Sequence, residues 1–214
     1  MIKNRSLTKR KRGEKMDGLK LASMYSYNCE NAHRYGFSQQ LKDFAEGKNS
    51  DAEKTRYCLK NLDSYEFYEI IAKINGIENP FDPRVISYYW KGIPYLKGGL
   101  WHNYATLIPI LKMPMELIFA NMVDECFVHP AQVIESSENS FLIRYSPVVK
   151  TDKEIIIDME TEKIVKKPIF LKVTTGNYVT IHYSTAIEEI DVDEFKNFLR
   201  ITNNSLKKFN ARHR

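Results

Sequence analysis

The sequence predicts a mixed α+β protein: an N-terminal helical domain, residues 16–123, followed by a small β-barrel with a C-terminal helix, residues 124–210. Three observations support this fold class. In the first half, apolar residues recur at helical spacing between helix start and stop signals. After Asp124 the pattern changes to short β-branched or alternating runs separated by polar turns. Near the C-terminus an amphipathic helical stripe returns.

A basic segment precedes the helical domain. Residues 1–15 contain seven lysines and arginines against the single acid Glu14. The formal net charge of +5 therefore belongs to this segment, and the remainder of the chain is close to neutral. We expect a disordered tail, with Met16 as a candidate start, and binding to RNA or an anionic membrane is the alternative. No apolar core follows the basic run, so a secretory signal peptide is not expected.

Residues 17–34 are predicted to form an amphipathic helix that ends at Gly36, and the polar residues 46–54 are predicted to form a loop. Asp63 and Glu66 have the spacing of a capping box, which predicts a helix that ends at Gly76. The residues expected on its inner face are Phe67, Ile70, Ile71 and Ile74.

Asp82 is expected to cap the next helix, with Pro83 in its first position, and Gly92 and Pro94 to end it. Its inward residues are Val85, Ile86, Tyr89 and Trp90. Residues 97–99 are predicted to form a flexible joint. Residues 101–123 are expected to complete the helical half, and within them residues 104–123 are expected to form a buried, kinked helix pair, because two prolines interrupt this stretch and two charges argue against a membrane span.

In the second half, strands are expected at residues 127–135, 140–148, 154–158 and 178–183, with turns at 136–139, 147–153 and 174–177. Asp191 and Glu194 form a second capping-box pattern, which predicts the start of the C-terminal helix. The residues expected on the inner stripe of this helix are Phe195, Phe198, Leu199, Thr202, Leu206 and Phe209.

The cysteines Cys29, Cys58 and Cys126 form no CxxC pair, and three cysteines cannot all be bridged. We therefore expect free thiols and a cytoplasmic protein. The sequence contains no GxGxxG, Walker, HExxH or GxSxG motif, so nucleotide-binding, zinc-protease and serine-hydrolase activities lack support.

Residues 125–208 resemble the HypC/HupF family of hydrogenase-maturation chaperones through two short motifs. The first is the family's opening Cys-x-x-x-Pro-x-Gln-Val, which Cys126, Pro130, Gln132 and Val133 match in register. The second is its Gly-Asp-Tyr-Val-x-x-His-x-Gly-x-Ala-Ile strand, which residues 175–191 resemble. The matching residues there are Gly176, Tyr178, Val179, His182, Ala186 and Ile187.

This resemblance implies a HypC-like, OB-like barrel in which Cys126 carries iron as an Fe(CN)2CO fragment and His182 assists the site. The implied partners are a HypD-like protein and a hydrogenase large subunit. The chain departs from the family in three ways: more than a hundred residues precede the cysteine, His129 replaces a small residue, and Ser184 replaces the usual glycine. Residues 82–92 and 101–104 also resemble the helical region of an uncharacterised prokaryotic family.

Cys126, His182, His129 and His102 form a candidate set of sulfur and nitrogen metal ligands if the fold gathers them, and hydrogen-bonded structural histidines are the alternative. Cys126 is expected at the start of the first strand. On an extended segment its side chain and that of His129 would point to opposite faces.

Three functions are compatible with these residues. The first is a metallocentre-assembly chaperone or carrier in which Cys126 holds a metal fragment for a protein partner. The second is an enzyme with Cys126 as nucleophile or ligand and His102 or His182 as base, in a cleft between the halves. The third is RNA binding by the barrel and the basic tail. The near-neutral charge of residues 16–214 argues against nucleic-acid binding apart from the tail.

Overall fold

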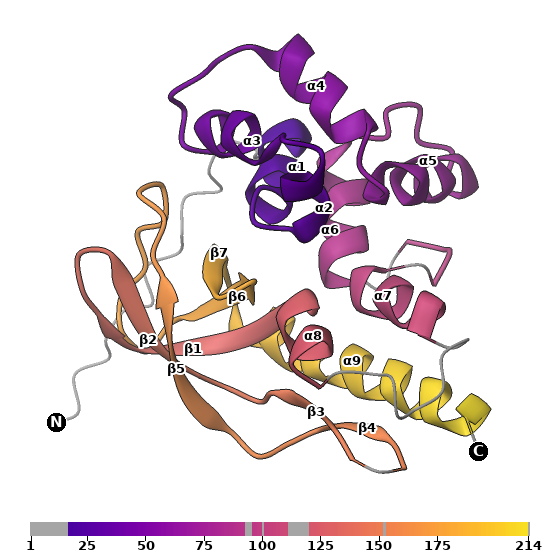
Figure 1. The fold of residues 1–214 in the computed structure, drawn as a ribbon, viewed down its shortest axis with the longest axis vertical. Coiled ribbons are helices and arrows are strands. Elements are labelled where there is room, and N and C mark those ends of the chain that lie inside the picture. Colours follow the sequence, from indigo (N-terminus) through magenta and orange to yellow (C-terminus); the bar gives the residue numbers. More distant parts are fainter. Residues whose placement is uncertain (1–16, 93–95, 100, 111–119, 152, 214) are drawn as a thin grey trace, which may run out of the picture.

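The computed structural model describes residues 17–92, 96–99, 101–110, 120–151 and 153–213. It confirms the mixed α+β class, because helices precede a closed five-stranded barrel and a long helix follows it (Figure 1). The helices span Gly18–Ser26 (α1), Glu30–Arg34 (α2), Ser38–Ala45 (α3), Ala52–Lys60 (α4), Ser64–Ile74 (α5), Pro83–Lys91 (α6), His102–Ile110 (α7), Ala120–Cys126 (α8) and Val192–His213 (α9). The strands span His129–Ser136 (β1), Ser140–Tyr145 (β2), Val148–Lys150 (β3), Ile155–Ile157 (β4), Thr161–Lys166 (β5), Tyr178–His182 (β6) and Thr185–Ile190 (β7).

The first predicted helix is divided in two. α1 ends at Ser26, and a new helix, α2, starts after Cys29, whose backbone is extended. The side chain of Asn28 in this break donates a hydrogen bond to Thr185 of β7, 2.8 Å away. α1 is buried on nearly all sides because α3, α4 and α6 pack around it. That position explains the mixed spacing of its apolar residues.

The predicted loop at residues 46–54 is too long. α4 begins at Ala52, where the side chain of Asp51 accepts a hydrogen bond from the backbone N–H of Lys54. α3, which lies before this loop, was not predicted. Both helices place few apolar side chains in the core, which leaves a weak periodic signal.

α5 and α6 confirm two predicted helices. The Asp63 carboxylate does not cap α5 and instead accepts hydrogen bonds from Asn31 and Arg34. In α6, Asp82 accepts a hydrogen bond from the Arg84 N–H at 2.8 Å, Pro83 occupies the first turn, and Gly92 closes the helix with φ +69°. The four residues expected to face inward from α6 are all buried.

α8 extends farther than predicted, and Cys126 is its last residue rather than the first residue of a strand. Helical bonding continues past it, since the Phe127 N–H donates to the Val123 carbonyl. β1 starts only at His129, where the chain pairs with Ile181 of β6. The predicted boundary at residue 124 therefore falls inside α8. Of the prolines expected to divide residues 101–123, Pro109 lies within α7 and Pro114 lies outside the described residues.

The barrel strands follow the closed order β1-β2-β5-β7-β6, with β6 pairing back onto β1. All pairs are antiparallel except β5 with β7. The small, OB-like barrel that was predicted is confirmed, and it has five strands. β5 and β7 were not predicted as separate strands, and β3 and β4 form a separate hairpin that packs on α8 and α9.

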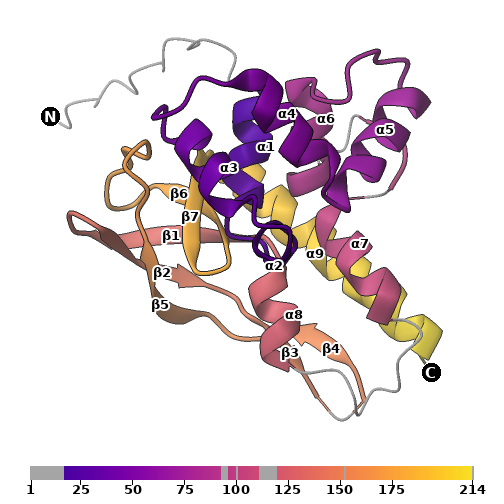
Figure 2. The same cartoon turned by 45° about the horizontal axis from the view of Figure 1, so that its top comes forward.

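One hydrophobic cluster contains residues of both halves. Val128, Ile187 and Phe198, which come from the barrel side, belong to the apolar cluster of the helical half. In both views α9 leaves the barrel and runs past α7 (Figures 1 and 2). The Asp191–Glu194 capping box at the start of α9 is confirmed, since each backbone N–H donates to the other residue's carboxylate.

A buried polar network also joins the halves. The ammonium of Lys91 in α6 lies 3.2 Å from Glu188 in β7 and 3.0 Å from Glu194 in α9. The Tyr25 hydroxyl of α1 donates to Glu188 at 2.6 Å and lies 2.9 Å from the Thr180 hydroxyl of β6. Within the described residues, no helix is both long and apolar enough to cross a membrane.

Candidate functional site

The Cys126 thiol lies at the junction of the halves and is partly exposed. Its sulfur is 2.8 Å from the Tyr183 hydroxyl oxygen. Burial raises the pKa of this thiol; the hydrogen bond from Tyr183 opposes the shift, and the carboxylates of Glu30 and Glu125 add to it. At neutral pH the group is therefore a protonated thiol with a hydrogen bond to a phenol.

Tyr183 and Ser184 form the two-residue turn between β6 and β7, and both have positive φ, +46° and +55°. Glycine, asparagine and aspartate are preferred in such turns, because a Cβ makes this conformation costly, by about 1–2 kcal/mol per residue. Contacts with Glu125 and Lys166 hold the turn. The Tyr183 N–H donates to the Glu125 carbonyl, Ser184 Oγ donates to the Glu125 carboxylate at 3.1 Å, and the Lys166 N–H donates to the Ser184 carbonyl. The strained turn is thus attached to the helix end that carries Cys126.

His102 and His182 lie together beside this helix end. Their ring centroids are 5.1 Å apart, with the rings nearly perpendicular, and both rings contact Trp90. His102 Nε2 lies 2.8 Å from the Cys126 carbonyl oxygen and its Nδ1 lies 3.3 Å from the Tyr89 hydroxyl. The structure therefore brings His102 to the backbone of Cys126 rather than to its thiol.

His182 has one unsatisfied nitrogen. Nδ1 lies 2.9 Å from the Tyr25 carbonyl oxygen, so it must carry the proton and donate. Nε2 is buried and forms no hydrogen bond of good geometry within the described chain, although the Cys126 backbone lies close enough to oppose the effect of burial on the pKa of the ring; because the proton is on Nδ1, Nε2 keeps its lone pair. Burial lowers the pKa of His182 to about 4 and that of His102 to about 3, and both imidazoles are neutral at physiological pH.

His129 belongs to a different network. Its Nε2 lies 2.9 Å from the Asp124 carbonyl oxygen and 3.2 Å from the Asp124 carboxylate, and its ring packs on Tyr145. Asp124 also accepts from the Tyr145 hydroxyl and from the Val148 N–H. These contacts account for His129 as a structural residue.

Across the described ranges, no group of three or more histidine, cysteine, aspartate or glutamate side chains is arranged to hold a metal ion. The metal role of Cys126, His182, His129 and His102 stays a prediction. The arrangement at Cys126 instead offers one thiol with a phenol partner and one neutral imidazole nitrogen with a free lone pair.

Two neighbours of this site were not predicted. Tyr183 follows His182 directly, but nothing in the sequence indicates that its phenol reaches Cys126. Cys29 directly precedes α2 and lines a cavity of about 330 Å³ together with Trp90 and His102. Burial raises the pKa of Cys29 to about 11, with a smaller contribution from the charge of Cys126. Almost one hundred residues separate the two cysteines, so only the fold reveals their relation.

Fold and site together define a mixed α+β protein in which a helical half and a closed barrel meet at a partly exposed cysteine. The chain belongs to the family of unknown function DUF6390, whose sequence profile matches residues 106–214. This range contains Cys126, His182 and Tyr183 but not Cys29 or His102. No curated protein and no solved structure gave a match.

Proposed function

We propose that this protein is a metallocentre-assembly carrier in which the Cys126 sulfur holds an iron fragment for transfer to a partner protein. The observation that carries the proposal is the partly exposed residue Cys126, whose sulfur lies 2.8 Å from the Tyr183 hydroxyl. The ring centroids of His182 and Tyr183 are 4.7 Å apart, so the phenol that bonds the sulfur also contacts the His182 imidazole.

Loading the fragment replaces the thiol proton with iron. The sulfur–hydrogen bond breaks, a sulfur–iron bond forms, and the proton leaves to solvent or to a neighbouring base. Tyr183 stays protonated in this step, because burial, with further contributions from the hydrogen bond and charge of Cys126, raises the pKa of its hydroxyl. Its hydroxyl can therefore donate a hydrogen bond to the thiolate and tune the sulfur–iron bond.

The site offers few protein ligands, which suits an iron fragment that already carries cyanide and carbonyl ligands. Cyanide and carbonyl would fill most positions around the iron, so one thiolate, aided by a neutral imidazole, suffices to hold it. A thiolate is a soft ligand for such low-spin iron. Because a single sulfur–iron bond would attach the fragment to the protein, its release to a partner is also favoured. The resemblance of residues 125–208 to HypC/HupF chaperones supports the same cargo and a HypD-like or large-subunit-like partner.

The proposal is tested with the full chain, purified without oxygen from a host that synthesises cyanide- and carbonyl-ligated iron. Infrared bands in the cyanide and carbonyl stretching region should accompany the wild type and a Cys58→Ser control, and disappear in Cys126→Ser. Circular dichroism establishes that all three proteins are folded. Bands that persist in Cys126→Ser, or a wild type without bands in such a host, would refute the proposal.

An enzyme with Cys126 as nucleophile has weaker support. Such a nucleophile needs a base within hydrogen-bond reach, whereas the described partner of the sulfur is a phenol whose own pKa is raised. His102 is bonded to the Cys126 carbonyl oxygen, and burial raises the thiol pKa. We therefore favour the carrier.

A further inference from the structure

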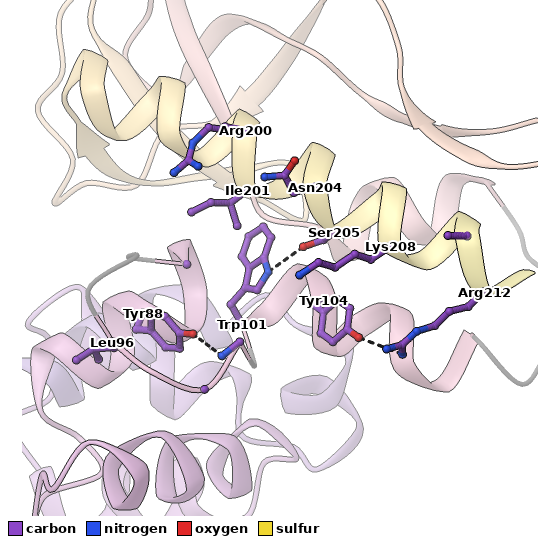
Figure 3. A pocket seen from close by; sticks show the side chains of 14 residues that line it. Tyr88, Leu96, Trp101, Tyr104, Arg200, Ile201, Asn204, Ser205, Lys208 and Arg212 are labelled. Atoms are coloured by element: carbon purple, nitrogen blue, oxygen red, sulfur yellow. Dashed lines mark hydrogen bonds between the residues drawn. The ribbon is translucent and has the colours of Figure 1, made fainter.

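A second cavity, of about 810 Å³, lies between α9 and the described residues that line it near the end of α6 and the start of α7, which are Tyr88, Gly92, Leu96, Gly98, Gly99, Trp101 and Tyr104. It is called the α9 groove below. Figure 3 shows the Trp101 ring standing between the α9 side chains and Tyr88. Leu96 and Ile201 complete an apolar floor. The volume is in the range of small-molecule sites.

A polar stripe follows α9 along this groove. Arg200, Asn204, Lys208 and Arg212 recur every four residues and therefore share one face of the helix (Figure 3). Each step rises about 6 Å, so the stripe is about 18 Å long. The described residues that line the groove include three cations and no aspartate or glutamate.

The positive charge of the stripe is not neutralised by the contacts recorded for it. Arg200 donates to the amide oxygen of Asn197 at 2.6 Å, and Arg212 donates to the Tyr104 hydroxyl at 3.3 Å. Both partners are neutral. Within the described parts of the chain, none of the recorded ion pairs involves Arg200, Lys208 or Arg212.

The floor presents apolar surface, because its polar atoms are bonded within the protein. Trp101 Nε1 donates to Ser205 Oγ at 3.1 Å, and the Tyr88 hydroxyl accepts from the Gly99 N–H at 2.7 Å. Trp101 is 4% exposed and Tyr88 is 5% exposed, so their covered rings are not stacking platforms for a single-stranded nucleic acid, and the apolar surface open to a ligand comes from the half-buried Leu96 and Ile201.

We propose that the α9 groove binds a small organic polyanion, a molecule with at least two phosphate or carboxylate groups on an apolar body. The guanidinium forks of Arg200 and Arg212 match phosphate and carboxylate oxygens, with the ammonium of Lys208 between them. The spread of the cations along the stripe requires more than one anionic group, and the floor accepts the apolar part. This binding is separate from the function proposed for Cys126.

The test titrates the full chain with 4,4′-dianilino-1,1′-binaphthyl-5,5′-disulfonate, a fluorescent dye that carries two sulfonates on an aromatic body. The double variant Arg200→Gln/Lys208→Gln removes two groove cations. The control Lys196→Gln/Lys207→Gln removes the same charge from exposed positions of α9 that do not line the groove. Groove neutralisation should weaken binding at least about tenfold, and the control should bind as the wild type does, since each contact with a charged group supplies about this factor. Equal melting temperatures exclude unfolding as the cause.

Competition then identifies the anionic group. ADP carries phosphates on an aromatic body, and benzene-1,3,5-tricarboxylate carries carboxylates. At least one of the two should displace the dye from the wild type, and the stronger competitor indicates the chemical source. Equal affinity of the two double variants, or no dye binding to the wild type, would overturn the proposal. Displacement by a decaglutamate peptide alone would overturn it in favour of an acidic protein partner.

Discussion

The bond between Tyr183 and Cys126 makes a quantitative prediction about the thiol. Replacing Tyr183 with phenylalanine removes the hydroxyl that lies 2.8 Å from the sulfur and keeps the ring and the strained turn. The hydrogen bond lowers the thiol pKa because it favours the charged form. Its loss should therefore raise that pKa further.

The size of the shift follows from the strength of one hydrogen bond. A net contribution of about 0.5–1.5 kcal/mol, at 1.36 kcal/mol per pKa unit, corresponds to a rise of about 0.4 to 1 unit. Because the thiol is partly exposed, water can replace some of the lost bond, which makes one unit the upper bound.

The assay measures the rate of iodoacetamide alkylation of Cys126 against pH by mass spectrometry, with Cys29 and Cys58 as internal references. Tyr145→Phe is the matched control, since it removes a hydroxyl that is bonded to Asp124 rather than to the thiol. Its profile should equal that of the wild type. A midpoint in Tyr183→Phe that stays the same or falls would show that the phenol does not stabilise the thiolate.

Three further predictions concern stability, each measured as the free energy of urea unfolding. Lys91→Met leaves the buried Glu188 without its cation and should cost about 3 kcal/mol, whereas Arg144→Met in an exposed pair should cost under about 1 kcal/mol; equal losses would contradict the buried network. Because burial lowers the pKa of His182 to about 4, the unfolded chain binds more protons than the folded chain below the ordinary histidine pKa, and stability should fall by about 1.5 kcal/mol between pH 6.5 and 5 through this residue. A His182→Gln variant with the same pH dependence would exclude this residue as the source. Gly18→Ala would place a Cβ 1.9 Å from the Phe81 carbonyl oxygen and should cost more than about 2 kcal/mol, so a loss below about 1 kcal/mol would show that the contact relaxes.

Local signals in the sequence predicted a large part of the fold. Asp82, Pro83 and Gly92 bound α6 as expected, and Asp191 with Glu194 starts α9. These elements were predictable because capping and periodic burial act within a few residues of the chain. The mixed α+β class, with a barrel after the helices, followed from the change of pattern after Asp124.

Long-range pairing determined the strands that were missed. β5 has charged residues at three of its six positions and only Val165 buried, so its alternation is weak. β7 follows the predicted strand at residues 178–183 and was not predicted as a strand of its own. It forms a strand because it pairs with β6 and, in parallel, with β5. Register of this kind depends on partners distant in sequence.

The candidate site was also predictable only in part. Sequence alone identified Cys126, His102 and His182 as chemically capable residues, and the structure places the two imidazoles side by side with His102 on the Cys126 backbone. Only the tertiary structure decided that Cys126 ends a helix, that Tyr183 is its partner and that His129 belongs to Asp124. Residue type determines which chemistry a side chain can perform, whereas the approach of side chains distant in sequence depends on how the helical half and the barrel pack.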